Sequence, residues 1–126
     1  MQIERIDHFV LTVASIEATC RFYVNALGVE IVEFAGGRKA LSFGTQKINL
    51  HERGREFEPK ASQPTCGSAD FCLISSVSLD VVVAHLTAQD IEVEQGIVAR
   101  SGANGPIRSI YIRDPDGNLV EIATYD

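Results

Sequence analysis

His8-Phe-Val-Leu-Thr12 recurs 62 residues later as Asp70-Phe-Cys-Leu-Ile74, and this repeated stretch decides the fold. The phenylalanine and the leucine occupy the same places in both copies. Apolar residues at every second position are typical of a strand with one buried face. The repetition therefore predicts two copies of one structural unit.

A helical pattern follows each copy of the repeat. Ser15 is expected to cap the first helix, which ends at Gly28, and Ser78 is expected to cap the second. Three short predicted strands then follow each helix. They are Val29–Phe34, Arg38–Phe43 and Gln46–Glu52 in the first copy, and Ile91–Val98, Ile107–Arg113 and Asn118–Tyr125 in the second.

The order strand–helix–strand–strand–strand defines two modules. Residues 1–52 form the first module, residues 53–67, with two prolines and two glycines, form a linker, and residues 68–126 form the second module. Because a unit of about 60 residues is only marginally stable alone, we expect the two modules to share a sheet or a core. The predicted fold is α+β, with two βαβββ modules forming a curved mixed sheet that encloses a cleft, in one domain of residues 1–126.

The composition points to small-molecule chemistry. The 126 residues carry eleven Lys and Arg against seventeen Asp and Glu, a net charge of −6, whereas nucleic-acid binding needs a basic surface. No apolar run is long enough to span a membrane, and the first residues do not resemble a signal peptide. The three cysteines form no CxxC motif and indicate reduced thiols, so we expect a cytoplasmic protein.

Polar residues of four predicted strands are expected to lie on the face of the curved sheet that is opposite its apolar face. Alternate residues of a strand point to opposite faces, which places His8 and its counterpart Asp70 away from the apolar face. Asn49 and His51 share a side of another strand, and Glu121 interrupts the apolar last strand. If a pseudo-twofold axis relates the modules, these residues converge on one concavity.

Three motifs resemble the vicinal oxygen chelate superfamily, which includes glyoxalase I, fosfomycin-resistance thiol transferases, bleomycin-resistance proteins and extradiol dioxygenases. The motifs are IDHFVLTV at residues 6–13, RFYVNALGVEIV at 21–32 and IYIRDPDGNLVEI at 110–122. Residues 38–61, RKALSFGTQKINLHERGREFEPKA, are similar to glyoxalase-domain-containing proteins and lactoylglutathione lyases. The resemblance implies paired βαβββ modules, a divalent metal ion in the cleft and a homodimer.

The resemblance also implies a set of metal ligands on the first and last strands of each module. Carried onto this sequence, the set is His8, His51, Asp70 and Glu121. Glyoxalase I has Glu at the position of Asn49 and His at the position of Asp70. Because a neutral amide is a poor ligand for a transition metal, we expect His51 rather than Asn49 to bind the ion, which would be Ni, Zn, Mn or Fe.

These residues favour a metal-dependent lyase or isomerase of the glyoxalase type, acting on a small α-oxo or glutathione-thioacetal substrate. The metal would stabilise an enediolate, and Glu121 or Asp70 would move the proton next to the carbonyl group. Two other functions stay open. One is an extradiol-type dioxygenase, since two histidines and a carboxylate also bind non-haem iron, and the other is a binding protein that sequesters its ligand.

Structural roles compete with each of these assignments. His51 could be a surface residue at a strand end, and Asp70 could cap a strand, whereas a buried Glu121 is costly unless paired or metal-bound. Four basic residues could anchor an anionic substrate or form ordinary exposed ion pairs. They are Arg38, Lys39, Lys60 and Arg113.

Overall fold

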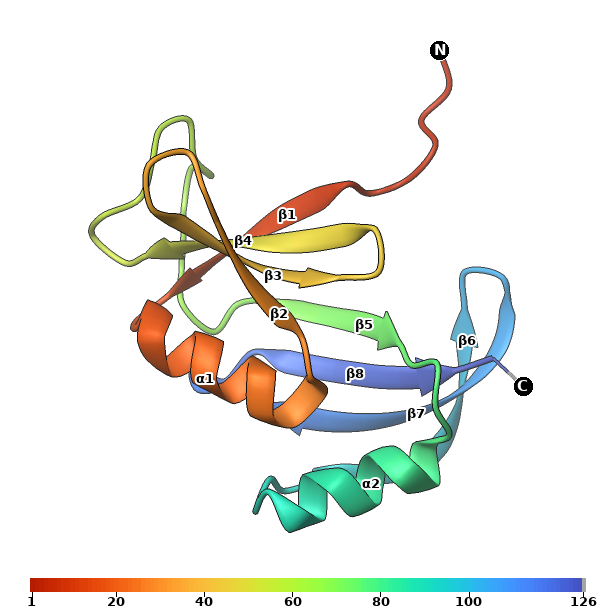
Figure 1. Ribbon diagram of the computed structural model, residues 1–126. Helices are drawn as coiled ribbons and strands as arrows, with labels where there is room; N and C mark the ends of the chain where they lie inside the picture. The colour runs from red at the N-terminus through yellow and green to blue at the C-terminus, as the bar shows by residue number, and fades with distance from the viewer. Residues whose placement is uncertain (126) are drawn as a thin grey trace. The chain divides into compact units, whose positions relative to one another are not determined.

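The computed structural model describes residues 1–125, and the chain divides into two units, Met1–Cys66 and Gly67–Asp126. In chain order the elements are β1 (His8–Val13), α1 (Ile16–Leu27), β2 (Glu30–Phe34), β3 (Arg38–Phe43), β4 (Gln46–Glu52), β5 (Asp70–Ile74), α2 (Leu79–Ala88), β6 (Gln95–Gly102), β7 (Gly105–Arg113) and β8 (Leu119–Thr124). Each unit has the order strand–helix–strand–strand–strand, which confirms the predicted α+β fold with two βαβββ modules (Figure 1). That both units form a single domain stays a prediction.

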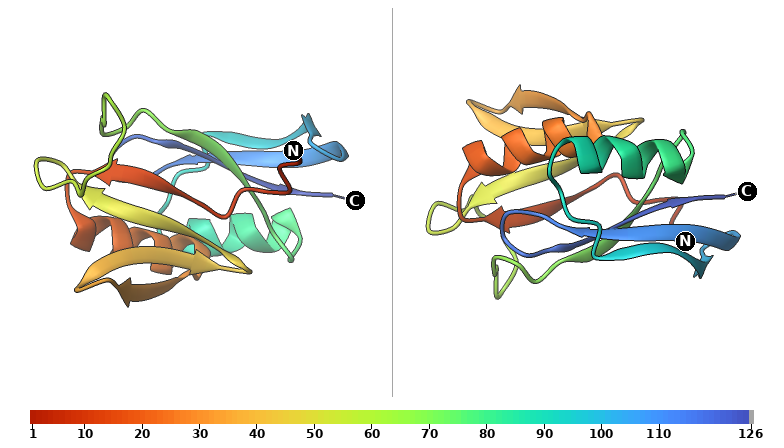
Figure 2. Two further views of the ribbon diagram at one scale, coloured as in Figure 1. Left: turned by 90° about the horizontal axis from the view of Figure 1, so that it is seen from above. Right: turned by 90° about the horizontal axis from the view of Figure 1, so that it is seen from below.

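The first unit is a four-stranded mixed sheet in the order β1-β4-β3-β2. β1 runs parallel to β4, and Figure 2 shows these two strands side by side, while the other neighbours are antiparallel. The parallel pair needs a long connection, which α1, β2 and β3 supply. α1 contacts β2, β3 and β4. The buried apolar residues of the sheet are Leu11, Val13, Ala40, Leu41, Ile48 and Leu50.

The second unit repeats this arrangement in the order β5-β8-β7-β6. β5 runs parallel to β8, one of the two inner strands, and α2 contacts β7 and β8. The buried apolar residues alternate along the strands, as the sequence pattern predicts. They include Ile110, Ile112, Val120 and Ile122 of the sheet, with Leu79 and Leu86 of α2.

Both predicted ends of α1 are confirmed. The Ser15 hydroxyl accepts a hydrogen bond from the Ala18 N–H at 3.1 Å, and Gly28 has a φ of 67°, which glycine adopts without steric cost. The Gly28 N–H donates to the Val24 carbonyl and closes the last turn. α1 is the longer helix, with 12 residues, and none of the described helices is long and apolar enough to cross a membrane.

The predicted boundaries of the sixth strand are wrong. The sequence pattern predicts a strand over Ile91–Val98, but β6 spans Gln95–Gly102. The Ile91 N–H donates to the Leu86 carbonyl at 2.9 Å, so the residues after α2 fold back against its end instead of entering the sheet. The register of β6 against β7 also shifts between Gln95 and Val98. The alternation of apolar residues at 91 and 93 therefore reflects half-burial in a loop.

Candidate functional site

Glu121 lies in the middle of the second unit's sheet. Its strand, β8, has β5 on one side and β7 on the other, and the residues directly opposite Glu121 are Cys72 and Tyr111. Val120 and Ile122 are buried on the other face of β8. Alternation along the strand thus places one carboxylate on the face that does not pack against α2.

A cavity of about 460 Å³ lies over this face of the sheet. The cavity is large enough for a small organic ligand. All its lining residues belong to the second unit, and most of them are polar. They are Asp70, Glu94, Gln95, Arg100, Tyr111, Leu119 and Glu121. The structure therefore brings together Asp70 and Glu121, the two residues that the sequence predicts as catalytic.

Two neighbouring side chains hold the Glu121 carboxylate. The Ser109 hydroxyl donates a hydrogen bond to Glu121 Oε2 at 2.5 Å. Burial, followed by the charge of Glu121 and a hydrogen bond to it, raises the pKa of the Cys72 thiol to about 11. Cys72 is therefore protonated at neutral pH and is not a nucleophile. These contacts hold the Glu121 carboxylate in place at the cavity.

Tyr111 and Arg100 form a second polar group in the same cavity. Arg100 Nε donates to the Tyr111 hydroxyl oxygen at 2.9 Å, and the guanidinium also lies 5.4 Å from the centre of the Tyr111 ring. Arg100 Nη2 donates to Gln95 Oε1 at 3.3 Å, which fixes the guanidinium. Because the tyrosine oxygen accepts from Arg100, its own proton is available to a ligand.

The two predicted histidine ligands lie apart within the first unit. His8 begins β1 opposite Lys47, whereas His51 lies opposite Thr12 near the end of β4. Four residues separate these positions, roughly 13 Å along the parallel strands. The His8 side chain is 45% exposed, and its Nδ1 lies 3.7 Å from a carboxylate oxygen of Asp7. The structure therefore does not bring His8 and His51 together on their sheet.

His51 does not fit the metal-binding role that the sequence predicts. It is only 3% exposed, and its Nε2 is 3.1 Å from Arg38 Nη2, which can only donate. The ring nitrogen that would bind a metal is thus occupied by a cation. Burial, and next the nearby charge of Arg38, lower the pKa of His51. A divalent ion at this nitrogen would meet an unfavourable positive charge.

Asn49 is also buried, at 5% exposure, and its Oδ1 has no hydrogen-bond partner. In residues 1–125, no group of three or more His, Cys, Asp or Glu side chains is arranged to hold a metal ion. The complete ligand set does not fit this structure, because His51 is engaged by Arg38 and Asn49 offers only an amide. The divalent metal ion and its ligand set of His8, His51, Asp70 and Glu121 stay predictions, and the contact between His51 and Arg38 opposes one of these four ligands.

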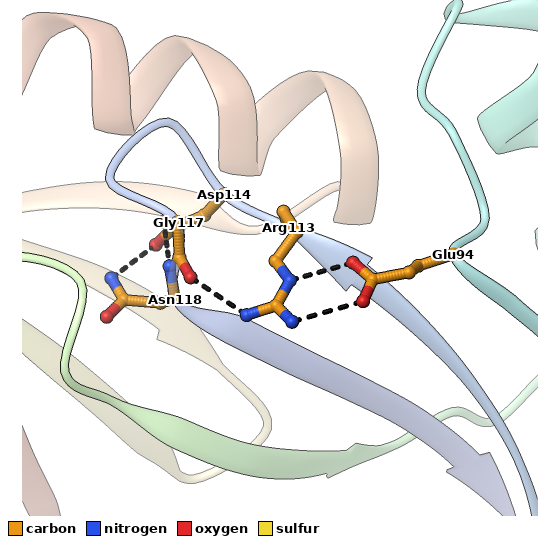
Figure 3. Close-up of polar contacts among 5 residues, drawn as sticks. All are labelled: Glu94, Arg113, Asp114, Gly117 and Asn118. Atoms are coloured by element: carbon orange, nitrogen blue, oxygen red, sulfur yellow. Dashed lines mark hydrogen bonds and ion pairs between the residues drawn. The ribbon is translucent and has the colours of Figure 1, made fainter.

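Arg113, one of the four basic residues proposed as anchors, has a structural role instead. Its Nε and Nη2 donate to the two carboxylate oxygens of Glu94 at 2.8 and 3.1 Å, and its Nη1 donates to the Gly117 carbonyl (Figure 3). The carboxylate of Asp114 accepts from the Asn118 backbone and side chain, which fixes the predicted turn. A guanidinium with these partners connects the turn to the segment before β6.

Two of the other three anchors are also paired. Lys39 Nζ lies 3.3 Å from Glu33 Oε1, and Lys60 Nζ lies 3.4 Å from Glu58 Oε1. Both are ordinary ion pairs between partly exposed side chains. Arg38 differs from them, because its partners are His51 and the rings of Phe34 and Phe57.

Sequence reasoning missed Ser109, which contacts Glu121, and the cavity residues Tyr111 and Arg100. Ser109 and Tyr111 alternate with buried Ile110 and Ile112, so the same period-2 pattern that identified Glu121 could have found them. Arg100 could not be placed, because the predicted sixth strand ended before it.

Comparisons with known proteins agree with the fold and with the motifs. The chain is 57% identical over 125 residues to Virulence protein STM3117 of Salmonella typhimurium, covering 99% of this chain and 87% of that protein. The crystal structure of that protein has a TM-score of 0.98 with this chain, at 56% identity and with both chains fully covered.

Two further relatives bear glyoxalase names. Glyoxalase domain-containing protein RDO1 of Mycosarcoma maydis is 48% identical over 125 residues, covering 99% of this chain and 70% of that protein. The crystal structure of lactoylglutathione lyase from Agrobacterium tumefaciens has a TM-score of 0.74 at 25% identity, covering 98% of this chain and 95% of that one.

The family comparison covers almost the whole chain, since residues 5–122 match one superfamily. The matched range includes every element from β1 to most of β8, and the motifs that the sequence analysis singled out lie within it. The chain belongs to the Glyoxalase/Bleomycin resistance protein/Dioxygenase superfamily.

Proposed function

We propose that the chain is a lyase or isomerase of the glyoxalase type, acting on a small α-oxo compound or its thioacetal. The observation that carries the proposal is the pairing of Glu121 with Tyr111 on adjacent strands in one cavity. A carboxylate base opposite a hydroxyl donor is the arrangement that enolisation next to a carbonyl requires.

The residues of the cavity suggest how the reaction would proceed. Glu121 removes the proton from the carbon next to the carbonyl group, and the carbonyl oxygen becomes an oxyanion. The Tyr111 hydroxyl donates a hydrogen bond to this oxyanion, and the Arg100 charge behind the tyrosine oxygen strengthens that donor. Glu121 then returns the proton to the former carbonyl carbon, while the hydroxyl proton of the hemithioacetal passes to the oxyanion. The hemithioacetal thus becomes a 2-hydroxy thioester without any net redox change.

The neighbouring residues support these roles. The hydroxyl of Ser109 orients Glu121, and Cys72 stays neutral, which avoids a second negative charge beside the base. Asp70 lines the same cavity two residues from Cys72 and is the other carboxylate that could move the proton. No step is assigned to a metal ion, because His51 and Asn49 do not complete a ligand set.

The test is turnover of the hemithioacetal of methylglyoxal and glutathione, followed by the absorbance of the thioester product. General base catalysis contributes about 10²–10⁴-fold, so we expect Glu121→Gln to lower kcat by that range. Tyr111→Phe should lower kcat less, because Arg100 remains. Glu92→Gln makes the same chemical change at an exposed position outside the cavity lining, and it should leave turnover unchanged.

Three results would contradict the proposal. Wild-type protein with no turnover would favour a ligand-binding protein, and oxygen uptake with bound iron would favour the dioxygenase. An unchanged kcat in Glu121→Gln together with a loss in Asp70→Asn would assign the proton transfer to Asp70 instead. Elemental analysis of protein purified without added metal tests the predicted divalent ion separately.

A further inference from the structure

The first unit carries two cations that no carboxylate neutralises. The Arg38 guanidinium lies 5.1 Å from the centre of the Phe34 ring, and Lys47 Nζ lies 3.6 Å from the centre of the same ring. Among residues 1–125, neither cation has a carboxylate within ion-pair distance. Two like charges that share one aromatic ring repel each other, and a bound anion would relieve that repulsion.

Both cations lie on one face of the sheet, together with a buried amide. Lys47 and Asn49 alternate along β4, and Ala40 of β3 is directly opposite Asn49. Arg38 is two residues from Ala40 and therefore shares its face. Asn49 is 95% buried, and its Oδ1 lacks a hydrogen-bond donor, which is costly. This amide needs a donor that the described residues do not supply.

Neighbouring side chains hold the Arg38 guanidinium in place but leave at least one of its nitrogens without a hydrogen-bond acceptor among the described residues. It lies against Phe34 and, at 4.5 Å, Phe57, and its Nη2 donates to His51. Its Nη1 makes no hydrogen bond with any described residue. The Glu56 carboxylate, which is near His51, is already used, because it accepts from the Gly54 backbone and lies 4.0 Å from Lys60.

We propose that this face of the first unit binds a small 2-hydroxycarboxylate with an apolar body. The carboxylate would pair with Arg38 and Lys47, and the hydroxyl would donate to the unpaired Asn49 Oδ1. Phe57, which is 45% exposed, offers a ring surface for the apolar part. The strand that the glyoxalase pattern uses for a metal cation thus has, in this chain, the chemistry of an anion site. This inference does not rest on the proposed function.

The experiment is an NMR titration of isotope-labelled full-length protein with mandelate and with phenylacetate, which lacks the hydroxyl group. We expect saturable shifts of β3 and β4 amides, with mandelate binding more tightly than phenylacetate. Loss of a charge-assisted hydrogen bond costs about tenfold or more in affinity, so Arg38→Gln should weaken mandelate binding by at least that factor. Lys47→Gln should weaken binding several-fold, and it tests the site independently if Arg38→Gln is unstable.

Two control variants make the result specific. Lys39→Gln removes a positive charge from the next residue of β3, which faces the other side of the sheet, and affinity should be unchanged. Asn49→Ala should remove the preference for mandelate over phenylacetate. The proposal is overturned by an absence of saturable shifts, by shifts confined to β7 and β8, or by equal weakening in Lys39→Gln. Because the titration measures binding and not turnover, failure of this anion-site proposal can be told apart from failure of the proposed enzymatic function.

Discussion

Cys72 and Glu121 are neighbours on adjacent strands, and each affects the chemistry of the other. Withdrawal from water and the adjacent negative charge both disfavour the thiolate, which is why the pKa of Cys72 rises to about 11. The same contact leaves Glu121 beside a neutral hydrogen-bond donor. A carboxylate in an apolar strand is thereby stabilised without a cationic partner.

Alkylation of Cys72 should therefore be slow although the residue, only partly withdrawn from water, is accessible to a reagent. The thiolate fraction at pH 8 is about a hundredfold lower for a pKa of 11 than for a pKa of 9, and the rate with iodoacetamide follows that fraction. Glu121→Gln removes the charge and should speed up the reaction, which mass spectrometry of the Cys72 peptide measures at several pH values. Equal rates in both proteins would show that Glu121 does not act on the thiol.

Protonation of His51 is coupled to the stability of the fold. Burial and Arg38 lower the pKa of His51 in the folded chain, whereas the unfolded chain keeps a value near 6.5. The unfolded state therefore binds more protons as the pH falls below 6.5, and the stability present above that pH is lost. We expect the Tm of the wild type to fall more than that of His51→Gln between about pH 7 and pH 5. An equal fall in Tm for both proteins would contradict the assignment of His51 as a buried, neutral histidine.

The sequence predicted the surroundings of Glu121 better than those of His51, and the reason is physical. A carboxylate in the run LVEIA must face away from the core, and alternation fixes which side it faces. His51 also faces the predicted side, but its role depends on Arg38, which lies on β3 at a position set by strand register. Register between distant strands is not encoded in a local pattern, so the Arg38 contact could not be predicted.

At the scale of elements, the two helices begin differently although both follow a serine. Ser15 accepts a hydrogen bond from the Ala18 N–H, whereas Ser78 makes no such bond at the start of α2. Helix capping by a side chain stabilises a protein by about 1 kcal/mol. Both modules therefore have a serine before the helix, but only the first module has the capping hydrogen bond.

Ser15→Ala should lower the free energy of unfolding by about 1 kcal/mol. Ser78→Ala is the matched control, because it removes a serine from the equivalent position without breaking a capping hydrogen bond. Its effect should be within about 0.5 kcal/mol of zero. Urea unfolding of both variants gives the comparison, and equal losses would show that the Ser15 contact contributes nothing.

The sixth strand shows where element prediction from the sequence stops. Seven strands start and end within two residues of the expected positions, because glycine turns and period-2 alternation fix their limits. β6 starts four residues late, since the chain after α2 first bonds to the end of that helix. That contact joins two elements, and only the folded unit specifies it.

At the scale of the whole molecule, each sheet leaves two strands at its edges. The orders β1-β4-β3-β2 and β5-β8-β7-β6 make β1 and β5 edge strands of their sheets. Both carry exposed apolar side chains, since Val10 is 43% and Ile74 is 56% exposed. Unpaired edges and exposed apolar residues favour association, and a symmetric dimer covers the same surface on both copies.

We therefore expect a homodimer, as the family resemblance also implies, and sedimentation velocity at micromolar concentration should detect it. Ile74→Glu places a charge on the β5 edge and should raise the dimer dissociation constant by about tenfold or more, since an unpaired charge in an apolar interface is costly. Val81→Glu is the matched control, because Val81 is 57% exposed on α2, a helix that contacts β7 and β8 of its own unit, and the dimer should persist. A monomeric wild type would contradict the prediction. A dimer that Val81→Glu disrupts and Ile74→Glu does not would move the interface from the β5 edge to the outer surface of α2.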